Sequence, residues 1–164
     1  MAWTNGIVRG QDDGSILAGG EWEEPMGTTS VDYAWRGAFT SDEVNRLHAE
    51  AFQHRLYTEA EWNWEHLTRV SLGWVTARRG PGLSGFVNVP WDGAVHAFIL
   101  DVMVAPSMRR QGIATRLVAL AREKALEAGC ELLHVDFEEH LSGFYFEACG
   151  FRPTPAGVIR LGAG

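Results

Sequence analysis

The sequence has few cysteines and no closely spaced pairs of cysteines or histidines that could bind a metal. It also has neither long apolar runs nor an excess of basic residues. Its 164 residues include two cysteines, Cys130 and Cys149, which lie far apart and outside any CxxC pair. Neither a disulfide framework nor a zinc site is therefore expected, and a reducing compartment is the default. The six histidines are scattered and form no HxxxH pair, so we expect no metal.

Other absences concern membranes and nucleic acids. No stretch approaches the roughly 20 apolar residues of a membrane span, and the N-terminus lacks a basic segment followed by an apolar run. We therefore expect a cytoplasmic protein with no membrane partner. The net charge of −7 argues against nucleic-acid binding, because displacing counterions from phosphates needs a concentrated basic surface.

The length and the 46% hydrophobic content favour one compact folded domain. The first thirty residues hold six glycines and little periodicity. We expect residues 1–30 to form a glycine-rich N-terminal arm and residues 31–164 to form the domain.

Hydrophobic patterns after the arm predict elements in the order β-α-α-β-β-β-α-β-α-β-β. The strands are expected at residues 33–39, 71–79, 83–91, 95–104, 131–137, 151–154 and 157–161, and the helices at residues 44–53, 59–70, 112–128 and 141–150. The almost wholly apolar segment 95–104 should be a central strand covered on both faces. This order indicates a mixed α/β domain in which helices flank a mostly antiparallel central sheet.

A candidate anion site lies between that central strand and the long helix, in the segment PSMRRQGIAT. Free N–H groups and the dipole at a helix start favour a bound anion, and Gly112 and Ala114 leave room for a pyrophosphate. Arg109 and Arg110 add positive charge. The chain has neither GxxxxGK[ST] nor GxGxxG after a strand, so neither an NTPase P-loop nor a dinucleotide site is expected.

The segment LDVMVAPSMRRQGIATRL resembles the acetyl-CoA motif of the GNAT acyltransferases, and FEACGFRPT resembles their closing helix and GF turn. The resemblance covers about residues 31–164. It implies an N-acetyltransferase that moves an acetyl group from acetyl-CoA to a primary amine by direct attack in a ternary complex. The implied cofactor-binding residues are Val102, Met103 and Val104 at the thioester and pantetheine, and Arg109, Arg110, Gln111, Gly112, Ile113, Ala114 and Thr115 at the pyrophosphate.

A base must take a proton from the attacking ammonium, and Asp101 is the first candidate. It interrupts an apolar strand beside the implied thioester site and resembles an acidic residue found there in some family members. The alternative is a structural aspartate that is hydrogen-bonded across the sheet. Further candidates for the base are Asp136, Glu138, Glu139, His96 and His134.

The general acid in related sequences is often the tyrosine of an FYxxxGF pattern, from which this chain departs. Phe146 stands at the usual position, and Tyr145 lies one residue earlier, about 100° around a helix. Either the helix contains an extra residue and Tyr145 is the acid, or there is no tyrosine acid.

The acceptor pocket of this superfamily is built from the first two helices and the strand edges. These segments contribute Phe52, Tyr57, Trp62, Trp64 and Trp91. The sequence leaves open small amines, aminoglycoside-like compounds, amino acids and proteins as acceptors, and a homodimer as the assembly. The main alternative function is a non-catalytic acyl-CoA-binding sensor or scaffold of the same fold.

Overall fold

The computed structural model describes residues 30–162, so the predicted N-terminal arm lies outside the described residues apart from residue 30. A five-stranded sheet with the order β1-β2-β3-β4-β5 forms the centre of the domain. Its strands are β1 (Asp32–Trp35), β2 (Ser71–Arg79), β3 (Gly82–Pro90), β4 (His96–Val104) and β5 (Leu132–Val135). The first four strands pair antiparallel, and β5 pairs parallel with β4.

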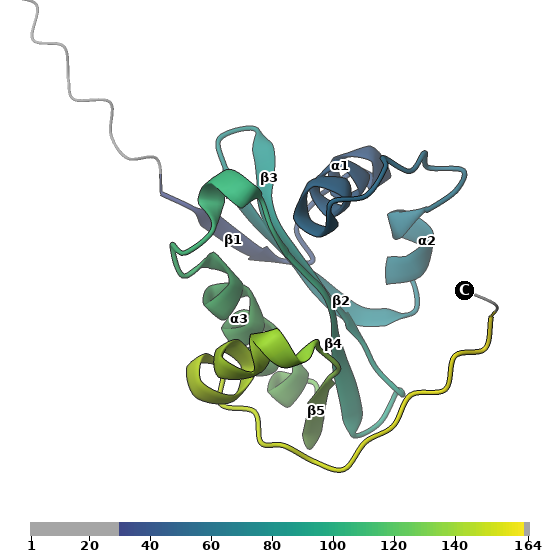
Figure 1. The fold of residues 1–164 in the computed structure, drawn as a ribbon, viewed down its shortest axis with the longest axis vertical. Coiled ribbons are helices and arrows are strands. Elements are labelled where there is room, and N and C mark those ends of the chain that lie inside the picture. Colours follow the sequence, from purple (N-terminus) through teal and green to yellow (C-terminus); the bar gives the residue numbers. More distant parts are fainter. Residues whose placement is uncertain (1–29, 163–164) are drawn as a thin grey trace, which may run out of the picture.

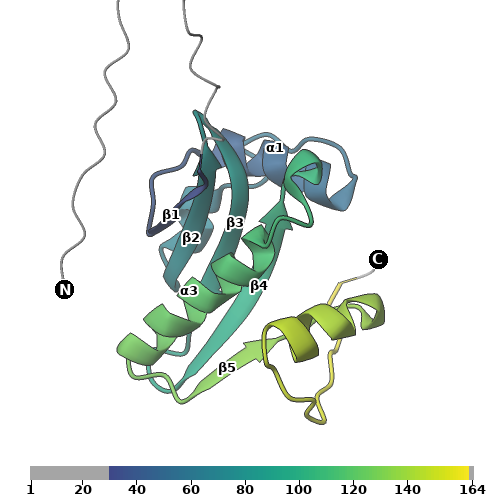
Figure 2. The ribbon, with the colours of Figure 1, turned by 90° about the vertical axis from the view of Figure 1, so that its left-hand side faces the viewer.

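Helices lie on both faces of the sheet (Figure 1). On one face are α1 (Ser41–Phe52) and the short α2 (Trp64–Thr68), and on the other is α3 (Ile113–Glu127). Figure 2 shows α3 running along the sheet and the helical segment after β5 lying at the end of that strand. The mixed, mostly antiparallel fold class predicted from the sequence is therefore confirmed.

Local signals explain where the helices begin and end. Thr40 and Glu43 form a capping box at the start of α1, in which the Thr40 hydroxyl accepts from the Glu43 N–H and the Glu43 carboxylate accepts from the Thr40 N–H. The left-handed Gln53 ends that helix. Gly129, with a φ of 89°, follows α3 and turns the chain toward β5.

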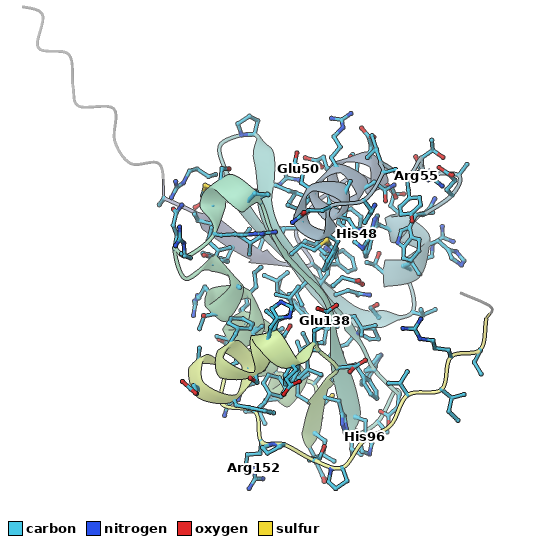
Figure 3. All side chains as sticks on the ribbon, viewed as in Figure 1. His48, Glu50, Arg55, His96, Glu138 and Arg152 are labelled. Atoms are coloured by element: carbon cyan, nitrogen blue, oxygen red, sulfur yellow. The ribbon has the colours of Figure 1, made fainter. Side chains whose placement is uncertain are left out.

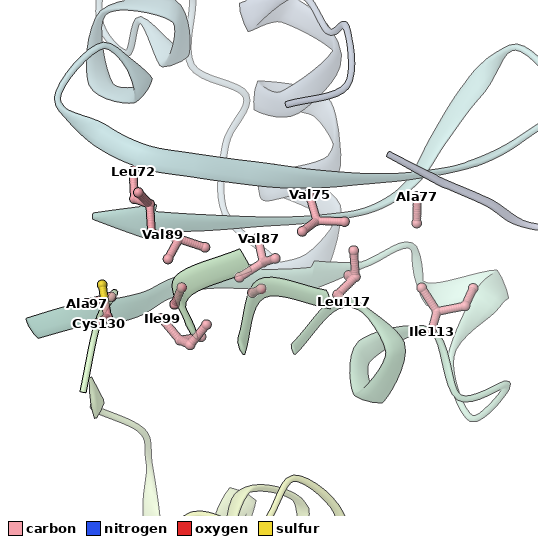
Figure 4. Close-up of a cluster of buried hydrophobic side chains, with 12 residues drawn as sticks. Leu72, Val75, Ala77, Val87, Val89, Ala97, Ile99, Ile113, Leu117 and Cys130 are labelled. Carbon is pink, nitrogen blue, oxygen red and sulfur yellow. The ribbon is translucent and has the colours of Figure 1, made fainter. Parts of the chain in front are cut away.

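The larger part of the core lies between the sheet and α3 (Figure 4). Its buried members are Leu72, Val75, Ala77, Val87, Val89, Ala97, Ile99, Ile113, Leu117, Ala121, Ala125 and Cys130. A second cluster lies under α1 and α2 and comprises Val44, Leu47, Trp64, Phe86 and Met103. In β3 and β4, neighbouring residues such as Phe86 and Val87 thus point to opposite clusters, as the two-residue period of a strand requires.

The end of the chain differs from the prediction. The expected helix at 141–150 is the 3-10 turn η2 (Glu139–Leu141) followed by the π-helix η3 (Gly143–Ala148). The strands predicted at 151–154 and 157–161 do not form, because residues 150–162 have no regular secondary structure. Pro153 cannot donate to a strand ladder, and the apolar pattern at 157–161 finds no partner strand.

The central strand is also less covered than predicted. Phe98 and Leu100 of β4 are exposed, although Ala97 and Ile99 are buried against α3. Neither α1 nor α2 reaches over this part of β4 (Figure 1). Within the described residues, no helix is both long enough and apolar enough to cross a membrane.

Candidate active site

A β-bulge interrupts β4 at Asp101. Phe86 of β3 pairs with Met103, whereas Asn88 pairs with Leu100, so two residues of β4 face one residue of β3. Asp101 itself has a φ of 55°, a left-handed conformation that aspartate tolerates better than most residues. The bulge therefore gives the backbone around Asp101 an orientation that a regular strand does not have.

Strands β4 and β5 separate at the same place. Their parallel pairing runs from His96 with Leu132 to Ile99 with Val135 and then stops. Residues 100–104 continue β4 beside β3, without a partner strand on the β5 side among the described residues. Backbone N–H and C=O groups on this free edge are available to a bound molecule. The edge includes Val102, Met103 and Val104, the residues that the family resemblance assigns to the thioester and pantetheine.

The loop from β4 to α3 ends in an open helix N-terminus. After η1 (Pro106–Met108), the chain passes through Arg110 with a φ of 60° and Gly112 with a φ of 77°. Gly112 is the N-cap of α3, and no side chain caps this end. The N–H groups of the first turn, at Ile113, Ala114 and Thr115, therefore remain available to an anion such as a pyrophosphate.

The long polar side chains predicted to bind the pyrophosphate, at residues 109–111, differ from one another in their contacts. Arg109 donates from Nη2 to the carbonyl oxygen of Ala51, at 2.9 Å, and thus connects the loop to the end of α1. Gln111 accepts a hydrogen bond from Arg79 at 3.2 Å. Arg110 is exposed. Arg109 therefore has a structural contact that the sequence did not reveal, whereas the Arg110 side chain has no hydrogen bond or ion pair with another residue of the described range 30–162.

Asp101 is partly buried, and this burial raises the pKa of its carboxyl above the ordinary value of 3.8. A carboxylate with a raised pKa holds a proton more readily, as a general base must. The other predicted bases lie on either side of Asp101 in the sequence. Asp136, Glu138 and Glu139 are exposed. His96 and His134 hydrogen-bond to one another, with Nδ1 of the first 2.8 Å from Nε2 of the second.

Tyr145 lies in the π-helix η3, where Cys149 N–H bonds to the carbonyl oxygen of Phe144 five residues earlier. A π-turn accommodates one more residue than an α-turn. The structure thus has the extra residue that the first of the two sequence interpretations required. Tyr145 is 6% exposed, and burial raises the pKa of its phenol to about 12.

The aromatic residues expected around the acceptor divide into two groups. Phe52, Tyr57 and Trp62 lie near the surface around α1 and the loop before α2. Trp64 is fully buried, and its Nε1 donates to Asn45 at 2.8 Å. Trp91 packs against the cluster beneath α3. Trp64 is therefore a core residue, and Trp91 lies partly buried at the edge of the core.

Asn88 is a polar residue of this region that the sequence reading missed. It is 5% exposed, and its Oδ1 is the only buried side-chain nitrogen or oxygen atom of the described residues that has no hydrogen-bond partner. The signal in the sequence is a single asparagine within the otherwise apolar strand GFVNVP. Buried polar atoms without partners are rare in folded proteins, so Asn88 calls for an explanation.

Two hollows of about 310 and 340 Å³ lie elsewhere on the surface. The first lies between β1, α2 and β2, and the second between α1 and the β2–β3 turn. Neither includes a residue of β4 or α3. Residues 30–162 contain no group of three histidine, cysteine, aspartate or glutamate side chains placed to hold a metal ion.

Comparison with known proteins identifies the family. The model of the acetyltransferase (GNAT) family matches residues 22–151. The chain belongs to the GNAT acetyltransferase family. No curated protein matches this GNAT sequence.

Solved structures share the GNAT fold of this chain. A probable acetyltransferase from meticillin-resistant Staphylococcus aureus has a TM-score of 0.69 at 18% identity, with 82% of this chain and 100% of that chain covered. An acetyltransferase from Trypanosoma brucei has a TM-score of 0.67 at 19% identity, with the same coverage. An aminoglycoside N-acetyltransferase in complex with CoA has a TM-score of 0.66 at 16% identity, covering 84% of this chain and 97% of that chain. At these identities, the likeness shows the fold alone.

Proposed function

We propose that this GNAT protein transfers an acetyl group from acetyl-CoA to a primary amine, by direct attack of the amine in a ternary complex. The observation that carries the proposal is the meeting of two features at the end of β4. One is the free edge of residues 100–104, and the other is the uncapped start of α3. A strand edge with free N–H groups can bind the thioester carbonyl, and an uncapped helix start can bind the pyrophosphate.

The loop and α3 would hold the donor. N–H groups of Ile113, Ala114 and Thr115 face an anion with the positive end of the helix dipole behind them. Gly112 has no atom within 4 Å of the place where a Cβ would stand, so a phosphate can approach its backbone. Arg110 adds a cation beside the same turn.

The free edge of β4 would hold the reacting carbonyl. Acetyl-CoA supplies an activated acyl group, and the N–H groups of the segment Val102, Met103 and Val104 that point to the free edge rather than to β3 are the donors available to its oxygen. Such donors stabilise negative charge that develops only in the transition state, and they need no reorganisation because the strand fixes them.

Two side chains would move protons. Asp101 takes a proton from the attacking ammonium, directly or through water, because its raised pKa suits it to a base. Tyr145 retains its proton at neutral pH, since its pKa is about 12, and gives it to the departing thiolate. The second proton, which the nitrogen loses after it has attacked, returns to the Tyr145 oxygen directly or through water, so the phenol is restored. The protein itself forms no covalent bond to the acetyl group.

Calorimetric titration with acetyl-CoA tests the donor site. Gly112→Glu would place bulk and negative charge at the start of α3 and should abolish binding. Because Gly112 has a φ of 77°, any side chain there is strained. Gly129→Glu is the matched control, since Gly129 has a φ of 89°, open space around it, and lies at the other end of α3. Loss of binding in both variants, or in neither, would contradict the assigned donor site.

The alternative, a non-catalytic acyl-CoA-binding protein, differs in one measurable respect. Both functions require acetyl-CoA to bind, but only the transferase releases CoA thiol in proportion to an added amine. Thiol release should therefore be followed with a panel of primary amines. Saturable binding of acetyl-CoA without turnover on that panel would favour the sensor or scaffold.

A further inference from the structure

Part of the sheet face that carries α1 and α2 is left open. Ala97 and Ile99 point to α3, so the intervening positions of β4 point to the opposite face. Leu133 and Val135 of β5 likewise pack toward the α3 cluster. We call the residues on the other face the open strip, which comprises His96, Phe98, Leu100, Leu132 and His134.

The open strip is apolar and aromatic at its centre. Phe98 is 41% exposed, Leu100 43% and Leu132 51%. The rings of Phe98 and His134 stack with their centroids 4.9 Å apart, and His134 stacks in turn on His96. Figure 3 shows His96 at the far end of β4 from the α1–α2 pair. The strip therefore offers a planar, nonpolar surface to solvent.

The end of the chain leaves the strip uncovered. Val158, Ile159 and Leu161 are 75%, 84% and 96% exposed, so these apolar side chains do not pack on the sheet. Figure 1 shows the segment after η3 passing around the domain rather than across α1 and α2. No described segment buries the rings of the strip.

One end of the open strip meets the candidate active site. Leu100 pairs across the sheet with Asn88, and the bulged Asp101 follows Leu100 directly. The Asn88 amide has a buried oxygen that accepts no hydrogen bond from the described residues. A bound amine can donate an N–H to this oxygen and keep its lone pair free to attack the thioester.

Charge narrows the class of acceptor. The strip itself carries no carboxylate. Asp101 and Asp136, which follow Leu100 and Val135, lie at its inner end, and the Asp92 carboxylate at the outer end accepts hydrogen bonds from the N–H groups of Ala94 and His96. A polyamine or aminoglycoside carries several separated positive charges, which need several carboxylates along the surface. A primary amine on an aromatic or other planar apolar group needs one polar end and one nonpolar surface, which is the arrangement found.

We propose that the open strip binds the aromatic or planar apolar body of the acceptor, with its amine held between Asn88 and Asp101. This inference rests on the proposed acetyltransferase function and specifies its substrate class. Asn88 is a positioning residue in this scheme, and Phe98 and Leu100 determine specificity.

The test compares amines and variants in the native full chain. Acetylation of 2-phenylethylamine should exceed that of spermidine and kanamycin by roughly tenfold or more in kcat/KM, as expected from burying one aromatic ring. Phe98→Ser should raise KM for 2-phenylethylamine by about tenfold and leave the Kd for acetyl-CoA unchanged. Leu126→Ser is the control, since Leu126 is 72% exposed on α3, and it should change neither.

Asn88→Leu separates positioning from a purely structural role. Removing a buried polar atom without a partner should leave Tm unchanged or higher, whereas KM for 2-phenylethylamine should rise by about tenfold. A structural asparagine would show no such rise. Asn45→Leu is the matched contrast, because both ends of the Asn45 amide are hydrogen-bonded and its loss should lower Tm.

The outcomes distinguish failure of the inferred substrate class from failure of the proposed acetyltransferase function. Native protein that fails to bind acetyl-CoA would remove the proposed function. Binding of acetyl-CoA with a preference for spermidine or kanamycin, unaffected by Phe98→Ser, would overturn only the inference. The inference alone would also be overturned if 2-phenylethylamine is not acetylated and calorimetry shows that it does not bind to the complex of the protein with CoA.

Discussion

The ring of Tyr145 stacks on the ring of Phe137, with centroids 4.6 Å apart and an angle of 25° between the planes. Phe137 lies just beyond β5, so this contact connects the π-helix to the strand that diverges from β4. Phe151 packs edge-on against the same tyrosine. Three aromatic contacts, including Phe144, thus fix the phenol ring without using its hydroxyl.

Tyr145→Phe should therefore act on chemistry far more than on stability. The substitution retains the ring and its packing but removes the proton that we assign to the departing thiolate. We expect kcat to fall by about 10²-fold, the lower end of the range for general acid catalysis. The Kd for acetyl-CoA should stay unchanged, and so should Tm. Steady-state thiol release and a thermal melt measure these quantities.

A double variant is the control for that prediction. Tyr145→Phe combined with Phe146→Tyr moves the hydroxyl by one residue, to the position where related sequences carry it. Because η3 is a π-helix, this position has a different direction, and Phe146 meets Phe137 only edge-on. We expect no rescue. Recovery of kcat in the double variant would argue that Tyr145 is not the acid.

The π-helix also marks a limit of sequence reading. The mismatch between Tyr145 and the family pattern could be seen in the sequence, and it defined two alternatives. The extra residue of the helix is visible only in the hydrogen bond from the Cys149 N–H to the Phe144 carbonyl oxygen, which depends on packing around Phe137 and Phe151 rather than on local propensity. The role of Tyr145 as the acid stays a prediction.

Asp101→Asn should raise stability at neutral pH while lowering activity. Burial raises the pKa of Asp101 in the folded state above the ordinary 3.8. Its contribution to stability is thus fully present below pH 3.8 and is lost as pH rises through the folded-state pKa. Asparagine accepts the left-handed conformation and carries no charge to desolvate. Urea denaturation should show the variant more stable at pH 7, with the difference vanishing near pH 3.

Activity gives the second half of that prediction. Without the base, kcat/KM should fall by about 10²-fold at neutral pH, and raising the pH should recover part of it as more free amine forms. Asp136→Asn is the control, because Asp136 is exposed and lies beyond β5. An Asp101→Asn protein with native kcat/KM would return Asp101 to the structural role left open by the sequence.

The strands show why the fold was largely predictable and its outer edge was not. The strand predicted at 71–79 has the same bounds as β2, since the segment has a strand-like pattern and is followed by Gly80 and Pro81. The apolar segment 157–161 has an equally good pattern, yet it stays irregular. A strand needs a partner, and whether β5 accepts one is a long-range property that no short window contains.

The same reasoning applies to the exposure of β4. A nearly continuous apolar run normally indicates a strand covered on both faces, and half of β4 follows this rule. Phe98 and Leu100 do not, because α1 and α2 end before they reach the β5 side of the sheet. The departure of these two residues from the rule is the basis of the acceptor surface that we infer.

His48 should make the protein lose stability in mild acid. It is half-buried on α1 (Figure 3), and burial, followed by the charge of nearby His54, lowers its pKa from 6.5 to about 4. The folded state thus disfavours a proton that the unfolded state accepts, so stability is full above pH 6.5 and is lost toward pH 4. Allowing for solvent screening, we expect a loss of about 1–2 kcal/mol.

His48→Phe tests that loss. The phenyl ring preserves packing against Phe52, whose centroid lies 4.7 Å from that of His48, but it does not titrate. The free energy of unfolding of this variant should depend less on pH between 6.5 and 4 than that of the native chain. His66→Gln, at an exposed position on α2, should leave the native dependence intact.

Arg109 and Arg110 should affect acetyl-CoA binding by different routes, although they are adjacent in sequence. The Arg109 guanidinium donates to the carbonyl oxygen of Ala51 at 2.9 Å and thereby holds the loop against α1. Arg110 is exposed beside the uncapped start of α3. We therefore expect Arg109 to position the loop, and Arg110 to attract the phosphates through its charge.

Salt dependence separates the two roles. Arg110→Gln should weaken acetyl-CoA binding by about tenfold at low salt and by much less at high salt, because salt screens an exposed charge. Arg109→Met should weaken binding at every salt concentration and lower stability by about 1 kcal/mol, since it removes a hydrogen bond that does not involve the ligand. Calorimetry at two ionic strengths and urea denaturation measure both. If Arg109→Met alone flattens the salt dependence, Arg109 turns to the phosphates when acetyl-CoA binds, and its contact with Ala51 belongs to the free protein.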